Sequence, residues 1–108
     1  MAQIPYNTQA SVLTTNGGQQ SALNLAAGAN LVKATAGRIF SLNVNTAGTA
    51  GTLAVYDSAT TAGAAASNLV WEGSATTAQG TVIVLNFPCA NGIVVTAPTG
   101  GVVAVSYV

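Results

Sequence analysis

The side chains that carry most protein chemistry are scarce in this 108-residue chain. Asp57 and Glu72 are its only acids, Cys89 is its only cysteine, and histidine is absent. General acid–base catalysis could therefore use only the pair Asp57 and Glu72. A serine nucleophile would lack a histidine partner, and a lone cysteine forms neither an internal disulfide nor a zinc site. We expect no catalytic, metal-binding or cofactor-binding residues, and we predict that the chain is not an enzyme.

Both acids have structural roles that compete with catalysis. Asp57 ends a predicted strand, where its carboxylate can cap the following turn through the amides of Ser58 or Thr60. Glu72 also ends a predicted strand and can pair with Lys33 or Arg38, the only basic residues. We favour these roles for the two carboxylates over an active site.

Charge is the most unusual feature of the composition. Only 4% of the residues are charged and the net charge is zero, whereas an average soluble domain has about 25% charged residues. A net charge near zero favours association, and the cores of protein interfaces are depleted of charge. The composition therefore predicts a surface that partners largely cover. A neutral extracellular or heat-tolerant surface is the alternative.

Two classes of partner are disfavoured by the same numbers. Binding to a phosphate backbone relies on Lys and Arg side chains, of which there are two, and a polybasic membrane patch needs more of them. No apolar run approaches the roughly 20 residues of a membrane-spanning helix, and residues 1–7 lack the pattern of a signal peptide. We expect neither a nucleic-acid partner nor a membrane partner.

Short apolar runs separated by Gly, Pro and Asn predict an all-β fold. The clearest run is 38–45, where Phe40, Leu42 and Val44 alternate with polar residues, as in a half-buried strand. Segment 58–67 reads as a loop that could contain one helical turn. The predicted strands are 31–35, 38–45, 52–57, 68–72, 81–87, 93–97 and 102–108, with 10–13 as a further short candidate.

About eight strands at this spacing predict an antiparallel β-sandwich, a jelly-roll-like fold or a small barrel. The last three strands are joined by short turn-rich links, which predicts an antiparallel meander. Strands 81–87 and 102–108 contain no charge. If either strand lies at an edge, it invites pairing with a strand of another chain. We favour a central position for both strands, with the edge position as the alternative.

The chain divides into an extended N-terminal arm, 1–20, and a single β domain, 21–108. The arm is polar and irregular, and it is predicted to lie on a partner; a loose tail is the alternative. Its apolar residues and the single tryptophan are the candidate partner-binding residues. These residues are Ile4, Tyr6, Val12, Leu13 and Trp71.

Several stretches of the chain resemble small virion proteins of tailed bacteriophages. The resemblance extends over about residues 30–108. The stretches are 32–38 (VKATAGR), 45–53 (NTAGTAGTL), 56–66 (YDSATTAGAAA), 87–95 (FPCANGIVV) and 100–107 (GGVVAVSY). Such proteins are commonly capsid decoration (cement) proteins, which are β-rich, often trimeric and seated where capsomers meet.

The resemblance implies a structural virion protein that decorates and stabilises a phage capsid. Its partner would be the lattice of the phage major capsid protein, and it would form a homo-oligomer, with a trimer favoured. It would be located in the virion, assembled in the cytoplasm of the bacterial host, and would need no cofactor. Other phage structural roles, as a head–tail connector, tail or fibre protein, are alternatives. A carbohydrate-binding module is a further alternative, which predicts an exposed aromatic side chain beside Asp57 or Glu72.

Overall fold

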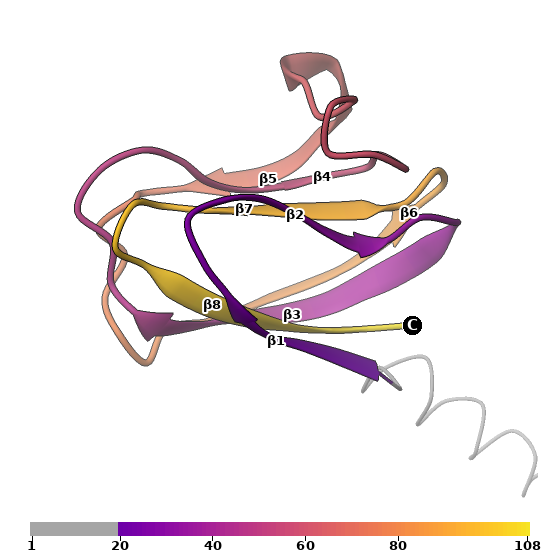
Figure 1. The fold of residues 1–108 in the computed structure, drawn as a ribbon. Coiled ribbons are helices and arrows are strands. Elements are labelled where there is room, and N and C mark those ends of the chain that lie inside the picture. Colours follow the sequence, from indigo (N-terminus) through magenta and orange to yellow (C-terminus); the bar gives the residue numbers. More distant parts are fainter. Residues whose placement is uncertain (1–19) are drawn as a thin grey trace, which may run out of the picture.

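The computed structural model describes residues 20–108, which form eight strands and one short 3₁₀ helix (Figure 1). The strands form where short runs of β-branched and aromatic residues lie between Gly, Pro and Asn turns, as expected for strand propensity. The elements are β1 (Gln20–Leu25), β2 (Gly28–Lys33), β3 (Gly37–Thr46), β4 (Leu53–Tyr56), η1 (Ala66–Asn68), β5 (Leu69–Gly73), β6 (Val82–Cys89), β7 (Ile93–Ala97) and β8 (Val102–Tyr107).

The eight strands form two four-stranded antiparallel sheets. Sheet A has the order β1-β8-β3-β6 and sheet B has the order β2-β7-β4-β5. Every strand-to-strand connection except β4–β5 crosses from one sheet to the other, which is the strand order of a jelly roll. The predicted all-β sandwich of about eight strands is therefore confirmed. Because sheets A and B are separate, the fold is a sandwich with the strand order of a jelly roll. It is not the small closed barrel that the sequence also allowed.

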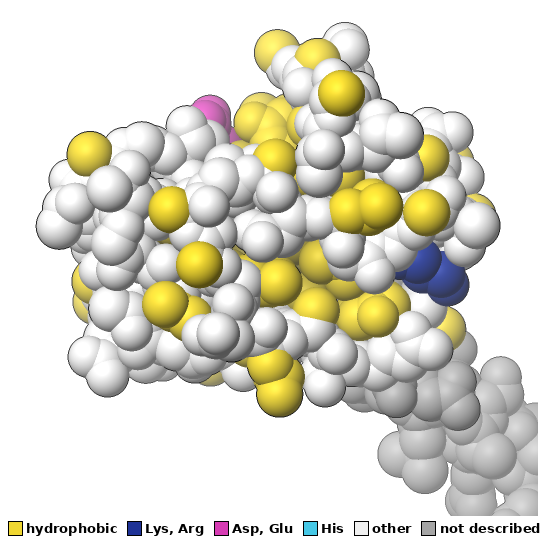
Figure 2. All heavy atoms as spheres, in the orientation of Figure 1, with side chains coloured by type: hydrophobic (Ala, Val, Ile, Leu, Met, Phe, Trp, Pro, Cys, Tyr) yellow, Lys and Arg dark blue, Asp and Glu magenta, His cyan; other side chains and the backbone are white. Residues whose placement is uncertain are grey.

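Strands β1 and β2 are the edge strands on one side of the sandwich. Strands β6 and β5 are the edge strands on the opposite side. On the β1–β2 side, apolar side chains are visible between the two layers, and charged side chains occupy only two small areas (Figure 2). Both layers therefore turn their apolar faces towards each other, as a sandwich requires.

The predicted C-terminal meander is wrong. Strands β6, β7 and β8 belong to sheets A, B and A in turn, because the turns between them carry the chain across the sandwich. Turn residues such as Asn91 and Gly92 indicate a reversal but not which sheet the next strand joins. The prediction of central strands is right for β8 and wrong for β6, which is an edge of sheet A. Strand β1 was not predicted, and candidate strand 10–13 lies outside the described residues.

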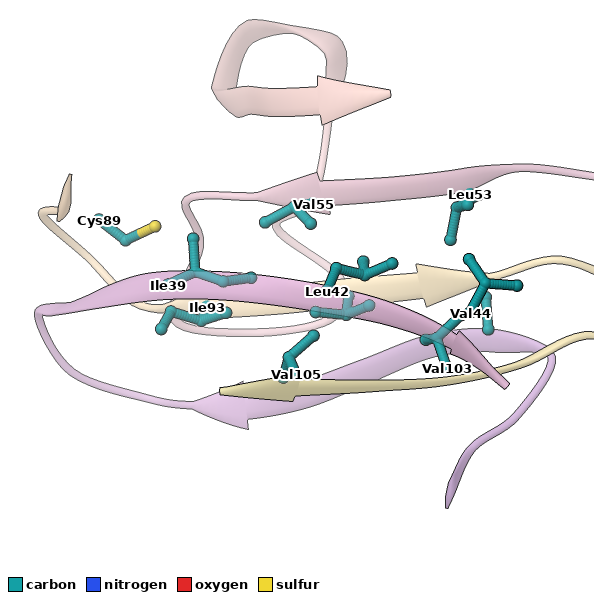
Figure 3. Close-up of a cluster of buried hydrophobic side chains, with 11 residues drawn as sticks. Ile39, Leu42, Val44, Leu53, Val55, Cys89, Ile93, Val103 and Val105 are labelled. Atoms are coloured by element: carbon teal, nitrogen blue, oxygen red, sulfur yellow. The ribbon is translucent and has the colours of Figure 1, made fainter. Parts of the chain in front are cut away.

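The core consists of small aliphatic side chains from the facing sides of the two sheets (Figure 3). Leu42 and Val105 pair within sheet A, and Val55 and Val95 pair within sheet B. All four are at most 3% exposed. Cross-strand pairs of this kind are the unit of sheet stabilisation.

One residue of the predicted alternation in β3 departs from it. Leu42 and Val44 are buried as expected, but Ile39 enters the core and Phe40 is only half-buried. The register with both neighbouring strands shifts between Ile39 and Ser41. An extra residue in a strand resets which side chains face inward, so the period of two is broken at Phe40.

Candidate functional site

Charged residues lie on both edge strands of sheet B, whereas the edge strands of sheet A have none. In sheet B, Lys33 ends edge strand β2 and Glu72 lies on edge strand β5. In sheet A, the edge strands β1 and β6 contain no charged residue. Natural sheets usually blunt exposed edges with charge, proline or a bulge. Sheet A therefore lacks charge at both edges, although β1 has a bulge between Ala22 and Leu25 and β6 contains Pro88.

Strand β6 also exposes apolar side chains. Val82 is 59% exposed, Val84 is 66% exposed and Phe87 is 43% exposed. Val82 and Val84 pair with Asn43 and Ser41 of β3. Paired residues share a face of the sheet, so both valines stand on the outer face of sheet A, opposite the core. Phe87 pairs with the buried Ile39 and therefore belongs to the opposite face. We call Val82 and Val84 the β6 patch.

The backbone of β6 has a second, separate binding capacity. The Val44 N–H donates to the Thr81 carbonyl at 2.9 Å, and hydrogen-bonded pairs alternate along an antiparallel ladder. The Val44 carbonyl accepts from the Gly80 N–H at 2.8 Å, so a bulge precedes β6, and the next bonded pair along the ladder is 42/83. Consequently the N–H and C=O groups of Val82 and Val84 point away from β3. We call this row of backbone groups the β6 edge; it lies in the plane of sheet A, whereas the β6 patch stands above that plane.

The far end of β6 is held against β3. The Arg38 guanidinium donates from Nη1 to the Asn86 carbonyl at 3.0 Å and to Asn86 Oδ1 at 3.2 Å. Asn86 has a φ of 47°, a left-handed conformation that asparagine adopts more readily than most residues. This local bend and Pro88 end the regular part of the edge. The accessible stretch is therefore 82–85.

The expected pairing of Glu72 with a basic residue is wrong. Arg38 lies in sheet A and binds Asn86 instead. Lys33 and Glu72 belong to the two opposite edges of sheet B, with two strands between them. At about 4.8 Å per strand, the side chains are too far apart to pair. The local sequence did not show this because it does not reveal strand order.

Trp71 lies on the edge strand of sheet B and packs partly against the core. It pairs with Val55, and its indole covers Gly73, where an added Cβ would lie 2.5 Å from Cη2. Of the candidate partner-binding residues, Trp71 is the only one within the described residues. Ile4, Tyr6, Val12 and Leu13 lie outside them, so their roles stay predictions.

The carboxylate of Asp57 is occupied by backbone amides. Its Oδ1 accepts from Asn91 at 2.8 Å and from Gly92 at 3.3 Å, and its Oδ2 accepts from Ala90 at 3.0 Å. Slight burial works to raise the pKa of Asp57, but the three amides favour the ionised form and lower the pKa below its usual value. The predicted cap of the adjacent turn is wrong. Ser58 makes that turn instead, through its Oγ and the Thr60 backbone.

Cys89 is equally unsuited to chemistry in the folded protein. It is 1% exposed and belongs to the core cluster. Burial, and next the negative charge of Asp57, raise the pKa of its thiol to about 11. Because the thiolate is the reactive form, Cys89 is an inert core residue.

Comparison of the chain with protein-family models, curated proteins and solved structures finds no match. The candidate site is therefore defined by the geometry of β6. Across residues 20–108, no group of three or more His, Cys, Asp or Glu side chains could hold a metal ion. The same part of the chain contains no helix that is long and apolar enough to cross a membrane.

Sequence reasoning found half of this site. The uncharged run 82–87 was visible as a possible pairing strand, but it was expected to be central. The exposed valines at positions 82 and 84 were not predicted as partner-binding residues. Their spacing of two within an uncharged strand was the available signal; the missing information was that β6 is an edge.

Proposed function

We propose that this protein is a structural component of a virion that decorates and stabilises a phage capsid by binding the assembled major capsid protein lattice. The observation that carries the proposal is the β6 patch, in which two apolar side chains are exposed on the outer face of an uncharged edge strand. Apolar residues in a charge-depleted setting are typical of the centre of an interface. Val82 and Val84 would be the lattice-binding residues.

The fold is compatible with this role. Jelly rolls are common in viral capsid domains and in lectins, although a fold alone does not establish a function. The resemblance of about residues 30–108 to small phage virion proteins favours the virion over the lectin reading. The virion would also be where the protein is located.

The physical mechanism would be mass action. A protein that binds the assembled lattice but not the free subunits stabilises the lattice by about 2.7 kcal/mol per site at 100 times its Kd. An oligomer that makes several weak contacts at once binds more tightly than a single copy, provided its geometry allows simultaneous contact. Such a mechanism needs no catalytic group, in keeping with the occupied carboxylate of Asp57 and the buried thiol of Cys89.

The experiment is a titration of the purified protein against undecorated capsids of the phage that encodes it. We expect saturable binding with a fixed number of copies per capsid, and a rise in the melting temperature of the capsid. A control with disassembled capsid protein should show weaker binding. Absence of saturable binding, with an unchanged melting temperature, would overturn the proposal.

Copy number separates this role from the other structural roles. Hundreds of copies per virion indicate decoration, whereas a dozen or fewer indicate a connector, tail or fibre component.

A carbohydrate-binding module is less well supported, because the Asp57 carboxylate binds three backbone amides and is not free for a sugar hydroxyl. Specific binding on a glycan array would favour that alternative.

A further inference from the structure

The β6 edge is a short row of backbone groups that no strand within residues 20–108 uses. Strand β6 is the last strand of sheet A, and the N–H and C=O groups of Val82 and Val84 point away from β3. The row is short, because the Asn86 carbonyl is already bound by Arg38 and a bulge at Gly80 precedes the strand. The donors and acceptors on offer therefore belong to residues 82 and 84 alone.

Charge or an irregular register blunts the other three edges of the sandwich. In sheet B, β2 ends with Lys33 and β5 contains Glu72. In sheet A, β1 is interrupted by a bulge between Ala22 and Leu25. Stretch 82–84 of β6 contains no charge and pairs with β3 in an unbroken register. Among the edges of the described domain, this stretch is therefore the best suited to pairing with a further strand.

The backbone groups of this stretch are complementary to themselves. When two copies pair about a two-fold axis, residue i of one copy faces residue j of the other, and j faces i. With Ile83 opposite its own counterpart, Val82 of each copy faces Val84 of the other. Both pairs are then of the hydrogen-bonded kind, in which the two residues exchange both bonds. Registers that place Val82 or Val84 opposite its own counterpart would bond only one of these two residues to the other copy's edge.

We infer that two copies of this chain pair antiparallel along stretch 82–84 of β6, with Ile83 at the two-fold axis. The two sheets A would become one continuous sheet. The inference rests on the proposed assembly role and names the contact between neighbouring copies. The β6 patches of both copies would lie together on the outer face of this sheet, where the lattice contact is proposed. A two-fold contact closes at two copies, so it favours a dimer over the trimer that the resemblance implies.

Charge favours a second copy as the partner. A two-fold contact turns every charge near the axis towards its own counterpart, so a charged edge would repel itself. Across β3 and β6 the only charged residue is Arg38, which is bound at Asn86. In the proposed register the two Asn86 residues lie six positions apart along the strands, about 20 Å. This exceeds the screening length of about 8–10 Å in physiological salt. A charged partner strand, by contrast, would find no ion pair along 82–84.

The side chains add to the contact on both faces of the sheet. On the outer face, exposed Val82 and Val84 would contact each other across the axis. On the inner face, the partly buried Ile83 would pack against its own counterpart. Cross-strand pairs of β-branched residues stabilise antiparallel sheets. The contact is nevertheless smaller than the roughly 1,000 Å² of a stable interface, so we expect a weak dimer that strengthens where a lattice holds two copies side by side.

Two cysteine variants of the full-length chain test the register. Val82→Cys and Val84→Cys lie at exposed positions, and the native Cys89 is buried. In the proposed register, position 82 of one copy and position 84 of the other have Cα atoms about 5.5 Å apart, which a disulfide can bridge. Identical positions lie about 8 Å apart, which is too far. We expect oxidised glutathione to cross-link the mixture of the two variants and neither variant alone. Equal cross-linking in all three samples, or none in the mixture, would overturn the inference.

A proline variant tests the backbone bonds without cysteine chemistry. Val84→Pro removes an N–H that points away from β3, a position at which an edge strand tolerates proline. Val84→Thr keeps this N–H and is the matched control. We expect sedimentation to show dimers of the wild type and Val84→Thr as the concentration rises to about 1 mM, where half of the copies pair even at a Kd of about 1 mM. Val84→Pro should stay monomeric with an unchanged circular dichroism spectrum.

Two outcomes of the sedimentation experiment would overturn the inference. One is a Val84→Pro variant that dimerises like the wild type. The other is a wild type that stays monomeric throughout, with Val82 and Val84 amides that are protected from hydrogen exchange only on capsids, which would assign the β6 edge to the capsid protein. If Val84→Pro does not fold, the cross-linking experiment decides. Because neither the cross-linking nor the sedimentation requires a capsid, the dimer can fail while the proposed function stands.

Discussion

The carboxylate of Asp57 accepts a hydrogen bond of 2.8 Å from the backbone amide of Asn91, 34 positions further along the chain. Asp57 follows β4 in sheet B, and Asn91 lies in the turn where the chain leaves β6 of sheet A for β7 of sheet B. The Ser58 N–H also donates to the Gly92 carbonyl at 3.2 Å. One carboxylate therefore fixes the turn that sends the chain from one layer to the other.

Replacing Asp57 with Asn should destabilise the fold. An asparagine side chain keeps one acceptor oxygen but presents an NH₂ group where the second oxygen was, so either the Ala90 amide or the Asn91 amide faces a donor. Loss of hydrogen bonds to a charged, partly exposed acceptor costs about 1–2 kcal/mol. Urea unfolding measures the difference. The matched control is Glu72→Gln at an exposed position of β5, which should change the free energy of unfolding by less than about 0.5 kcal/mol.

Asp57 should also make the stability depend on pH in the acid range. Its pKa in the folded protein is lowered from 3.8, so the unfolded chain takes up a proton at a higher pH than the folded one. The contribution of Asp57 is therefore complete well above pH 3.8 and is lost as the pH falls through the lower folded value. Urea unfolding between pH 6 and pH 3 should show a smaller acid loss in Asp57→Asn than in the wild type. An identical loss in both would contradict this assignment.

The role of Asp57 illustrates what the sequence could and could not predict. Short apolar runs bounded by Gly, Pro and Asn located seven of the eight strands, because that pattern depends only on neighbouring residues. The partners of Asp57 and the edge position of β6 depend on the order of strands, which no local pattern contains. The bulge at Phe40 was likewise missed, because it is defined by register with two other strands.

Gly73→Ala should disturb Trp71, whose indole occupies the space that a Cβ would need. The added carbon would lie 2.5 Å from Cη2 and 2.7 Å from Cζ2, so the ring must shift. We expect a loss of about 1–3 kcal/mol of unfolding free energy, the usual cost of overpacking, and a red shift of fluorescence as the indole becomes more exposed. Trp71 is the only tryptophan, so the emission reports on this contact alone. Leu69→Ala on the same strand should leave the emission unchanged.

Cys89 should resist thiol reagents for as long as the protein is folded. With a pKa of about 11, roughly one thiol in ten thousand is ionised at pH 7, and the sulfur is buried in the core cluster. Labelling with a maleimide at pH 7 should be slow in buffer and fast in denaturing urea. Because the chain has one cysteine, mass spectrometry gives the labelled fraction directly. Rapid labelling of the native protein would contradict the burial of this residue.

Val84→Lys should separate lattice binding from folding. Val84 is 66% exposed, so the isolated protein should tolerate the lysine within about 0.5 kcal/mol. In the proposed lattice contact the same ammonium group would be buried without a partner. We expect at least a tenfold weaker affinity for undecorated capsids, which corresponds to about 1.4 kcal/mol.

Two control variants accompany Val84→Lys. Val84→Thr retains the branched shape without a charge and should bind more tightly than Val84→Lys. Leu23→Lys places the same charge on β1, at the opposite edge of sheet A, and should bind like the wild type. Equal losses for Val84→Lys and Leu23→Lys would show that any added charge weakens binding, and would remove the assignment of the lattice contact to β6.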